Sequence, residues 1–348
     1  MSGVTLQDIA RECGVSTATV LRAVRHKGYV SAEKRHQIEQ TAARLGYIPR
    51  QTRRTTILPD AKLIAHFLHE NAHPLFGRLS DGIGRVAMEN GYAVITQHID
   101  TRFNAVQIAH MIDKLRSYNI SGVIMNSLAD IVDFMPIRRY LQDLPFPVVM
   151  IERVADIFNI SKVLINAREG LFLAVKHLVS QGHRRIAFFN READHPVERD
   201  RVEGFRRAAA AYGLGSEAVL VPTEDYRFTD GYNALQAHMI NQPRPTAIIA
   251  SDSLLVGMLQ YLYQHAVHVP RDMSLVGIDD TFAKVLAPRL SSIAFPEKEM
   301  CETAVRLILE QSGKKEGVSA KQILLSPTLV HRQSVAAPSG TSDDGEGV

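Results

Sequence analysis

The chain has 348 residues, of which 45% are hydrophobic and 22% are charged, and this composition is typical of a globular protein with two or three domains. No apolar run approaches the roughly 20 residues that span a bilayer, and the first residues lack the pattern of a secretory signal, so we expect a cytoplasmic protein. The two cysteines, Cys13 and Cys301, cannot form a zinc site alone, and we expect both to stay reduced.

The net charge of +3 is unevenly distributed. Residues 1–54 hold ten Lys and Arg against four Asp and Glu, a formal charge of +6, so residues 55–348 carry a formal charge of −3. A small basic segment attached to a mildly acidic body indicates that the N-terminal segment alone binds a polyanion.

The N-terminal segment opens with the pattern of a short capped helix. Thr5 and Asp8 are spaced as a variant of the capping box, and the apolar residues over 6–13 fall on one helical stripe. Gly14 is expected to end this helix, because glycine readily takes the left-handed conformation at a helix C-terminus.

Two more helices are expected after this glycine. Ser16 is a suitable N-cap for a second helix from Thr17 to about Arg25, and a third helix is expected from the Ser31 cap to Leu45. A helix, a glycine turn and a second capped helix together predict a helix-turn-helix.

In a helix-turn-helix the second helix enters the major groove of DNA with its N-terminal end first. Thr17, Ala18 and Arg22 would then face base edges, where arginine reads guanine and small apolar groups contact the thymine methyl. Neighbouring basic side chains would bind phosphates and set the position of the helix. The candidate DNA-binding residues are Thr5, Ser16, Thr17, Ala18, Thr19, Arg22, Arg25, Ser31, Arg50, Arg53 and Arg54.

The segments VTLQDIARECGVSTATVLRAV and VSAEKRHQIEQTAARLGYIP resemble the N-terminal domain of the lactose/galactose repressor (LacI/GalR) family of bacterial transcription regulators. The resemblance continues to about Arg332. It implies a DNA-binding domain at residues 1–49, a hinge at 50–61, an effector-binding and dimerisation domain at 62–335, and a disordered tail at 336–348.

Two departures from the family's pattern stand out. Leu21 occupies a position where the family usually has serine, and Thr56 occupies the position of the leucine that enters the minor groove. The hinge segment 50–58 is rich in β-branched residues, which weaken helix propensity, and Ile57 or Leu58 could substitute for the missing leucine. The sequence leaves open whether this hinge folds on DNA and bends it.

From Lys62 onwards, short apolar runs alternate with amphipathic helical patterns. The expected strands are 63–68, 93–96, 122–125, 148–151, 186–189, 219–221, 247–250 and 274–278, and the expected helices are 77–89, 106–115, 171–179, 202–211, 231–239 and 254–263. This alternation predicts parallel sheets covered by helices on both faces. The predicted fold class is therefore an all-α helix-turn-helix head followed by an α/β body. The resemblance implies that this body consists of two Rossmann-like lobes similar to type I periplasmic sugar-binding proteins.

The resemblance also implies three chain crossings between the lobes, near 160, 292 and 320. The N-lobe would then comprise about 62–160 and 292–320, and the C-lobe about 161–291 and 321–335.

Parallel sheets bind ligands outside the carboxyl ends of their strands, where several polar residues of this chain are expected. The resemblance implies that Arg201, at the start of the helix after strand 186–189, and Asp279 clamp effector hydroxyls, and charge-assisted hydrogen bonds suit that role. Alternatively, Arg201 pairs with Glu198 or Asp200 on the surface, and Asp252 and Asp280 act as helix caps. The candidate effector-binding residues are His73, Phe76, Asn126, Glu152, Ile165, Arg201, Tyr226, Ser253, Asp279 and Phe295.

These features predict a sequence-specific DNA-binding regulator, a repressor of a carbohydrate-utilisation operon, which binds a pseudo-palindromic operator as a homodimer and is controlled by a sugar or sugar derivative bound between the lobes. The alternatives are a solute-binding protein without a DNA role and a regulator whose effector is a nucleoside or purine. No nucleophile–base motif or phosphate loop is present, so we expect no enzyme and no cofactor. We also expect no metal, because hydrogen bonding accounts for His66, His69 and His73. Effector identity, inducer or corepressor action, and dimer or tetramer assembly remain open.

Overall fold

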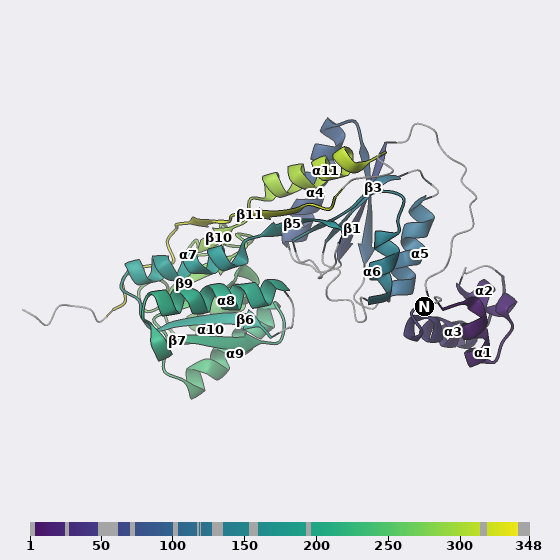
Figure 1. Cartoon of the computed structure of the whole chain (residues 1–348). Coiled ribbons are helices and arrows are strands. Elements are labelled where there is room, and N and C mark those ends of the chain that lie inside the picture. Colours follow the sequence, from purple (N-terminus) through teal and green to yellow (C-terminus); the bar gives the residue numbers. More distant parts are fainter. Residues whose placement is uncertain are drawn as a thin grey trace, which may run out of the picture. The chain divides into compact units, whose positions relative to one another are not determined.

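The computed structural model describes residues 4–24, 28–47, 62–69, 74–99, 104–116, 118, 120–126, 135–152, 159–192, 196–313 and 319–339. Three helices form its N-terminal part (Figure 1). The helices are α1 (Leu6–Cys13), α2 (Thr17–Val24) and α3 (Ala32–Arg44). The predicted capping box closes the start of α1: the backbone N–H of Asp8 donates to the Thr5 hydroxyl over 3.4 Å, and the backbone N–H of Thr5 donates to the Asp8 carboxylate over 2.8 Å. Gly14 follows with φ of 62°.

The three helices share a small apolar core. Ile9, Val20 and Ile38 are fully buried, one from each helix, and Tyr47 covers the cluster after α3. Ser31 caps α3 as predicted, by accepting from the backbone N–H of Lys34 over 3.4 Å. The sequence therefore predicted the three helices to within one residue wherever the structure describes their ends.

The rest of the chain contains two six-stranded sheets. The first comprises β1 (Leu63–His69), β2 (Ala93–Ile99), β3 (Ile120–Asn126), β4 (Val148–Ile151), β5 (Ser161–Ile165) and β11 (Gln322–Leu325), in the order β11-β5-β4-β3-β1-β2. The second comprises β6 (Ile186–Arg191), β7 (Ala218–Thr223), β8 (Ala247–Ser251), β9 (Ser274–Ile278), β10 (Ser291–Ala294) and β12 (Thr328–Val330), in the order β12-β10-β9-β8-β6-β7. Strands β1 to β5 pair in parallel, as do β6 to β10, and β12 pairs antiparallel with β10.

Helices connect the strands as the sequence predicted. Those that follow strands of the first sheet are α4 (Pro74–Glu89), α5 (Ala105–Arg116) and α6 (Met135–Gln142), and α11 (Glu297–Gln311) precedes β11. Those around the second sheet are α7 (Ala167–Ser180), α8 (Pro196–Ala211), α9 (Phe228–Asn241) and α10 (Asp252–Gln264). The predicted α/β architecture with two parallel-dominated sheets is confirmed.

The chain divides into two compact units. The first comprises Met1–Ala72, Leu79–Val163 and Met300–Ile323, and the second comprises His73–Arg78, Leu164–Glu299 and Leu324–Val348. Strand β10 belongs to the second sheet, and the chain leaves the second unit only after Glu299.

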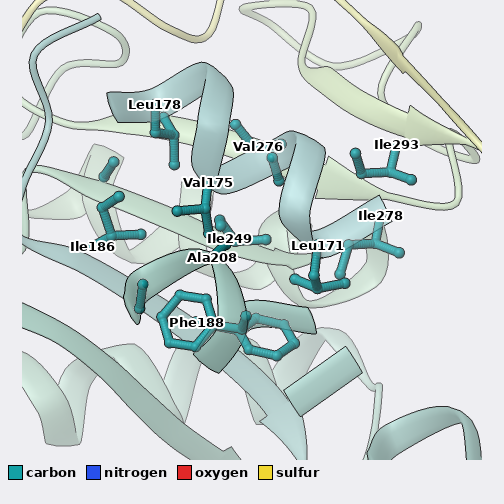
Figure 2. Packing of buried hydrophobic residues seen from close by; sticks show 14 of the residues in the cluster. Leu171, Val175, Leu178, Ile186, Phe188, Ala208, Ile249, Val276, Ile278 and Ile293 are labelled. Carbon is teal, nitrogen blue, oxygen red and sulfur yellow. The ribbon is translucent and has the colours of Figure 1, made fainter. Parts of the chain in front are cut away.

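Alternate side chains of β6 are buried on opposite faces of the second sheet. Ile186 and Phe188 pack with α7 and α8, and Ala187 and Phe189 pack with α9 and α10. Figure 2 shows the first of these layers, in which Leu171 and Val175 of α7 lie over the strands. The continuous apolar run of β6 thus reflects a strand that is covered on both sides, as expected for a parallel sheet.

Helices α4, α7, α8 and α9 begin three to six residues earlier than predicted. We expected Arg201 to begin the helix after β6, but α8 begins at Pro196, so Arg201 lies in its second turn. Proline fits the first turn because its missing N–H would have no partner inside the helix there. The short strands β5, β10, β11 and β12 and the helices α6 and α11 were not predicted at all.

Candidate functional site

Helix α2 exposes one face and buries the other. Val20, Ala23 and Val24 are buried, whereas Thr17, Ala18 and Arg22 are exposed. The Ser16 hydroxyl accepts from the backbone N–H of Thr19 over 3.2 Å, which fixes the N-terminal turn. The guanidinium Nε of Arg22 donates to the carbonyl of Ala18 over 3.3 Å, so the Arg22 side chain lies back along the helix toward that turn. The three predicted base-reading side chains therefore share one accessible face.

The other candidate DNA-binding residues fall into two groups. Thr5 and Ser31 cap helices, and Thr19 is partly buried, with its hydroxyl 2.9 Å from that of Ser16. Arg25, Arg50, Arg53 and Arg54 lie outside the described residues, as does the hinge segment that holds the last three.

The second sheet has a topological switch point between β6 and β8. The chain adds β7 on one side of β6 and then β8 on its other side, so the connections leave the carboxyl ends of β6 and β8 in opposite directions. Ligands of such sheets bind outside the carboxyl ends at this point. Asn190 and Arg191 end β6, and Ser251 ends β8.

A buried polar network lies at the carboxyl end of β6. Arg201 of α8 donates to the phenol oxygen of Tyr226 over 2.9 Å, and this oxygen lies 3.4 Å from the amide oxygen of Asn190 and 3.2 Å from a carboxylate oxygen of Glu198. Glu198 is 1% exposed and Arg201 is 7% exposed. The structure thus brings the predicted residues Arg201 and Tyr226 together with Asn190, which the sequence did not single out, and with Glu198, which it gave only as an alternative surface partner of Arg201.

The proposed surface pairing of Arg201 with Glu198 or Asp200 is not what the structure contains. Arg201 and Glu198 are both buried and meet through Tyr226, and Asp200 pairs with Arg168 over 2.8 Å. A buried charge is costly unless it is paired and hydrogen-bonded, and this network satisfies that requirement.

Asp252 is buried and holds the loop that follows β9. Its carboxylate accepts from the backbone N–H groups of Phe282, over 3.0 Å, and Ala283, over 2.8 Å, and from the Ser292 hydroxyl over 3.0 Å. Burial, and after it the nearby Asp279 carboxylate, raises the pKa of Asp252 well above its ordinary value. Asp252 is not a helix cap, because Ser251 caps α10, and the candidate Ser253 is buried in the first turn of that helix.

Asp279 has a separate set of partners. It is 3% exposed, has φ of 86°, and its carboxylate accepts from the backbone N–H of Thr281 over 3.1 Å. Its backbone carbonyl accepts from Arg78 over 3.4 Å, and the Arg78 Nε donates to Glu297 over 2.9 Å. Asp280 is not a cap either, since its carboxylate pairs with Arg332 over 2.7 Å.

In the first sheet, Asn126 at the end of β3 contacts His66 of β1. The His66 Nε2 and the Asn126 amide oxygen are 2.8 Å apart, and the Ser80 hydroxyl lies 3.3 Å from the other ring nitrogen. Burial lowers the pKa of His66 to about 4, so the ring is neutral at pH 7 and donates from Nε2. Hydrogen bonding therefore accounts for His66.

The remaining candidates are dispersed. Glu152 follows β4 with φ of 64°, Ile165 ends β5, and Phe76 lies in the first turn of α4; all three are buried. Phe295 follows β10 and packs against the apolar layer under α7 and α8. His73 lies outside the described residues.

Two further searches covered the described part of the chain. No group of three or more His, Cys, Asp and Glu side chains there could hold a metal ion. None of the helices there has both the length and the apolar character needed to cross a membrane.

Comparison with known proteins finds matches to two separate parts of the chain. Residues 5–50 match the model of bacterial regulatory proteins of the lacI family, and residues 175–335 match that of the periplasmic binding protein-like domain. The ribose operon repressor of Haemophilus influenzae is 27% identical over 95% of this chain and 98% of that protein. The chain thus combines a segment similar to the DNA-binding part of lacI-family regulators with a periplasmic binding protein-like segment.

Other relatives also match nearly the whole chain. The HTH-type transcriptional repressor CytR of Escherichia coli is 26% identical over 97% of the chain and 98% of that protein. The solved structure of the transcriptional regulator CelR–cellobiose complex has a TM-score of 0.69 and 25% identity over 95% of this chain and 99% of that chain. The relatives named here are transcriptional regulators, the class of protein that the sequence predicted.

Sequence reasoning missed Asn190 and Arg191, and it named Glu198 only as an alternative surface partner of Arg201. The signal for Asn190 and Arg191 was their place directly after the apolar run of β6, the same rule that selected Asn126 after β3. The sequence did not show that Glu198 is buried in the first turn of α8, because that helix was expected to begin later.

Proposed function

We propose that this protein is a sequence-specific DNA-binding repressor of a carbohydrate-utilisation operon, and that a sugar or sugar derivative controls its affinity for operator DNA. Two copies set two helix-turn-helix domains on a pseudo-palindromic operator. The protein acts by binding rather than by catalysis, and it works in the cytoplasm, where operator DNA lies.

The observation that carries this proposal is the exposed face of α2. Thr17, Ala18 and Arg22 project from a helix whose other face is anchored in the apolar core of the N-terminal domain. A rigid helix of this kind fits the major groove, and its arginine supplies the two parallel donors that read guanine. The match of residues 5–50 to the lacI family supports this assignment.

The polar network around Arg201 and Tyr226 supports the effector site. It lies at the switch point of the second sheet, and it combines a guanidinium, a carboxylate, an amide and an aromatic ring, which are groups suited to sugar hydroxyls and to the apolar face of a pyranose. Relatives bear the names ribose operon repressor and CelR–cellobiose complex, and both names support a sugar.

Regulation in this proposal is a population shift. The effector binds one arrangement of the two-lobed domain, 62–335, more tightly than another, and this difference changes how the domain at 1–49 meets DNA through the hinge at 50–61.

The test selects DNA from a random duplex library with the full-length protein and then measures binding of the selected duplex against excess competitor at moderate ionic strength. We expect selection of an inverted repeat whose affinity exceeds that of random DNA by about 10³-fold or more. Addition of sugars one at a time should change this affinity for at least one sugar. Binding that shows no preference for any duplex, with or without sugars, would overturn the proposal.

A further inference from the structure

Two histidines of the second unit, His177 and His331, lie side by side. His177 is in the last turn of α7, and His331 directly follows β12. The Nε2 of His177 and the Nδ1 of His331 are 3.4 Å apart, and the two ring centroids are 4.3 Å apart at an interplanar angle of 69°. The residues are 154 positions apart in the sequence, so the fold of the unit brings them together.

A hydrogen bond between the two rings accounts poorly for this arrangement. An N–H donor usually lies about 2.7–3.2 Å from its acceptor, and the separation here is longer. Burial, and after it the nearby rings of His331 and His183, lowers the pKa of His177. The His177 ring is therefore neutral at pH 7 and keeps a nitrogen lone pair, which is the form of imidazole that binds metal ions.

The separation of the two nitrogens matches that of two ligands of one tetrahedral metal ion. Imidazole nitrogens bind Zn²⁺ at about 2.0–2.1 Å, and two such ligands at the tetrahedral angle lie about 3.4 Å apart. His331 is exposed, so its ring can turn until both lone pairs meet at one ion. Among the residues that the structure describes, no third His, Cys, Asp or Glu joins the pair, so water would occupy the remaining positions.

Both histidines are attached to well-held backbone. On α7, Val175 and Leu178 lie close to His177 in sequence and are fully buried in the core of the second unit. After β12, the backbone N–H of Arg332 donates to the Ser291 hydroxyl over 2.9 Å. A metal ion would therefore find both backbone positions already fixed, which lowers the entropic cost of binding.

The pair lies at the opposite end of the second sheet from the network around Tyr226. Strand β12 runs antiparallel to β10, and Val330 pairs with Ser292 near the amino end of β10. His331 follows Val330 and so lies toward the amino ends of the parallel strands, whereas Tyr226 contacts Asn190 at the carboxyl end of β6. A metal ion held by the pair would thus be separate from the proposed effector site.

We propose that His177 and His331 together bind one divalent transition-metal ion of the kind that imidazole prefers, and that Zn²⁺ fits their spacing. The bound ion joins α7 to the segment after β12 and stabilises the second unit. This site goes beyond the proposed function and does not depend on it.

The experiment titrates ZnCl₂, CuCl₂ and MgCl₂ separately into the untagged full-length protein and follows binding by calorimetry. We expect a tightest site that holds one Zn²⁺ per chain, and we expect Cu²⁺ to bind there more tightly than Zn²⁺. Mg²⁺ should not bind this site, because it prefers oxygen ligands. Zn²⁺ should also raise the melting temperature, since it binds the folded state.

The titration is repeated with His177→Gln, His331→Gln and a control, His268→Gln. The His268 side chain is 60% exposed and belongs to the second unit, so the control removes one imidazole from the same unit. We expect each variant of the pair to bind Zn²⁺ about tenfold or more weakly, because even outer-shell partners of a metal contribute about 10–100-fold. The control should bind Zn²⁺ as the wild type does.

Electron paramagnetic resonance of the protein with one equivalent of Cu²⁺ counts the nitrogen ligands directly. We expect two coupled nitrogens in the wild type and in the control, and one in each variant of the pair. Thermal melts without metal show which variants are folded. If one variant of the pair does not fold, the other decides, and if neither folds, the nitrogen count of the wild type decides.

Four results would overturn the proposal. They are the absence of Zn²⁺ binding, unchanged Zn²⁺ affinity in a folded variant of the pair, a loss in the control as large as that in the pair, and a wild-type spectrum without two coupled nitrogens. Each of these results leaves the proposed function untouched, because the operator selection described above tests it separately.

Discussion

Arg201 and Tyr226 meet across two connections of the second sheet: the Arg201 guanidinium donates to the Tyr226 phenol over 2.9 Å. Arg201 lies in the second turn of α8, and Tyr226 lies two residues before α9 begins. The bond joins the segments that follow β6 and β7, so a ligand that contacts one of these side chains also affects the other.

Arg201→Ala should remove the response to the effector. The substitution leaves Glu198 buried beside a cavity, and loss of one partner of a buried charged hydrogen bond costs about 2–5 kcal/mol of binding free energy. Titration of the sugar found in the screen should show an affinity reduced by about 30-fold or more. Operator affinity without sugar should stay close to that of the wild type, and a variant that still responds normally would show that Arg201 does not contact the effector.

Tyr226→Phe should reduce sugar affinity less than Arg201→Ala does. It keeps the aromatic ring, which lies 5.7 Å from the guanidinium carbons of Arg191 and Arg201, and it removes only the phenol oxygen. We expect a loss of sugar affinity of about threefold to tenfold, because a single hydrogen bond contributes about 1 kcal/mol. An effect as large as that of Arg201→Ala would mean that the hydroxyl itself binds the effector.

Arg22→Ala should weaken binding to the selected operator by about 1–3 kcal/mol and should spare affinity for random DNA. Arg11→Ala is the matched control, since Arg11 is also exposed in the N-terminal domain but lies on α1. Competition assays against both duplexes give the two free energies. If Arg22→Ala weakens both duplexes equally, Arg22 binds phosphate and does not read bases.

His66 should make the stability of the protein depend on pH. Burial lowers its pKa in the folded state to about 4, whereas the unfolded chain has the ordinary value near 6.5. The unfolded state therefore binds a proton first as the pH falls, so the contribution of neutral His66 is complete above pH 6.5 and is lost between pH 6.5 and 4.

The test compares urea unfolding of the wild type with that of His66→Gln at pH 7 and pH 5. Between these values the wild type should lose about 2 kcal/mol more unfolding free energy than the variant. Other histidines with lowered pKa values, His177, His183 and His238, change stability in the same direction in both proteins and cancel in the comparison. Equal losses in the two proteins would contradict the assignment.

Gly204→Ala should destabilise the second unit. A Cβ atom at Gly204 would lie 2.4 Å from the carbonyl oxygen of Arg168, so α7 and α8 would have to move apart, at a cost of about 1–3 kcal/mol. Gly84→Ala is the control, because a Cβ there meets nothing within 4 Å in a helix, where alanine is preferred to glycine. Thermal melts should show opposite shifts, and a tolerated Gly204→Ala would contradict the tight helix contact.

Hydrophobic periodicity predicted the helices that bury one whole face and the strands that are buried along their whole length. The capped helices around Ile9 and the buried strands around Phe188 were evident because hydrophobic spacing fixes both. The edge strand β12 is only three residues long and partly exposed, so its pattern carried no comparable signal.

The candidate site was predictable only in part. The rule that strand ends carry ligand-binding residues selected Asn126 and Asp279. The rule does not distinguish a side chain that contacts a ligand from one that bonds to other residues of the protein. Asp252 illustrates the second case: its three hydrogen bonds hold the loop after β9, and a Cβ atom at Gly277 would lie 2.0 Å from one of its oxygens. Such a role depends on contacts between residues far apart in sequence.

The phenol of Tyr226 has a single proton and two acceptors within reach, the amide of Asn190 and the carboxylate of Glu198. Its proton can be donated to only one of them at a time. A ligand hydroxyl could donate to the other acceptor without breaking the bond from Arg201 to Tyr226. A ligand could thus bind in the second unit by adding a hydrogen bond to this network, without the loss of a bond that is already present.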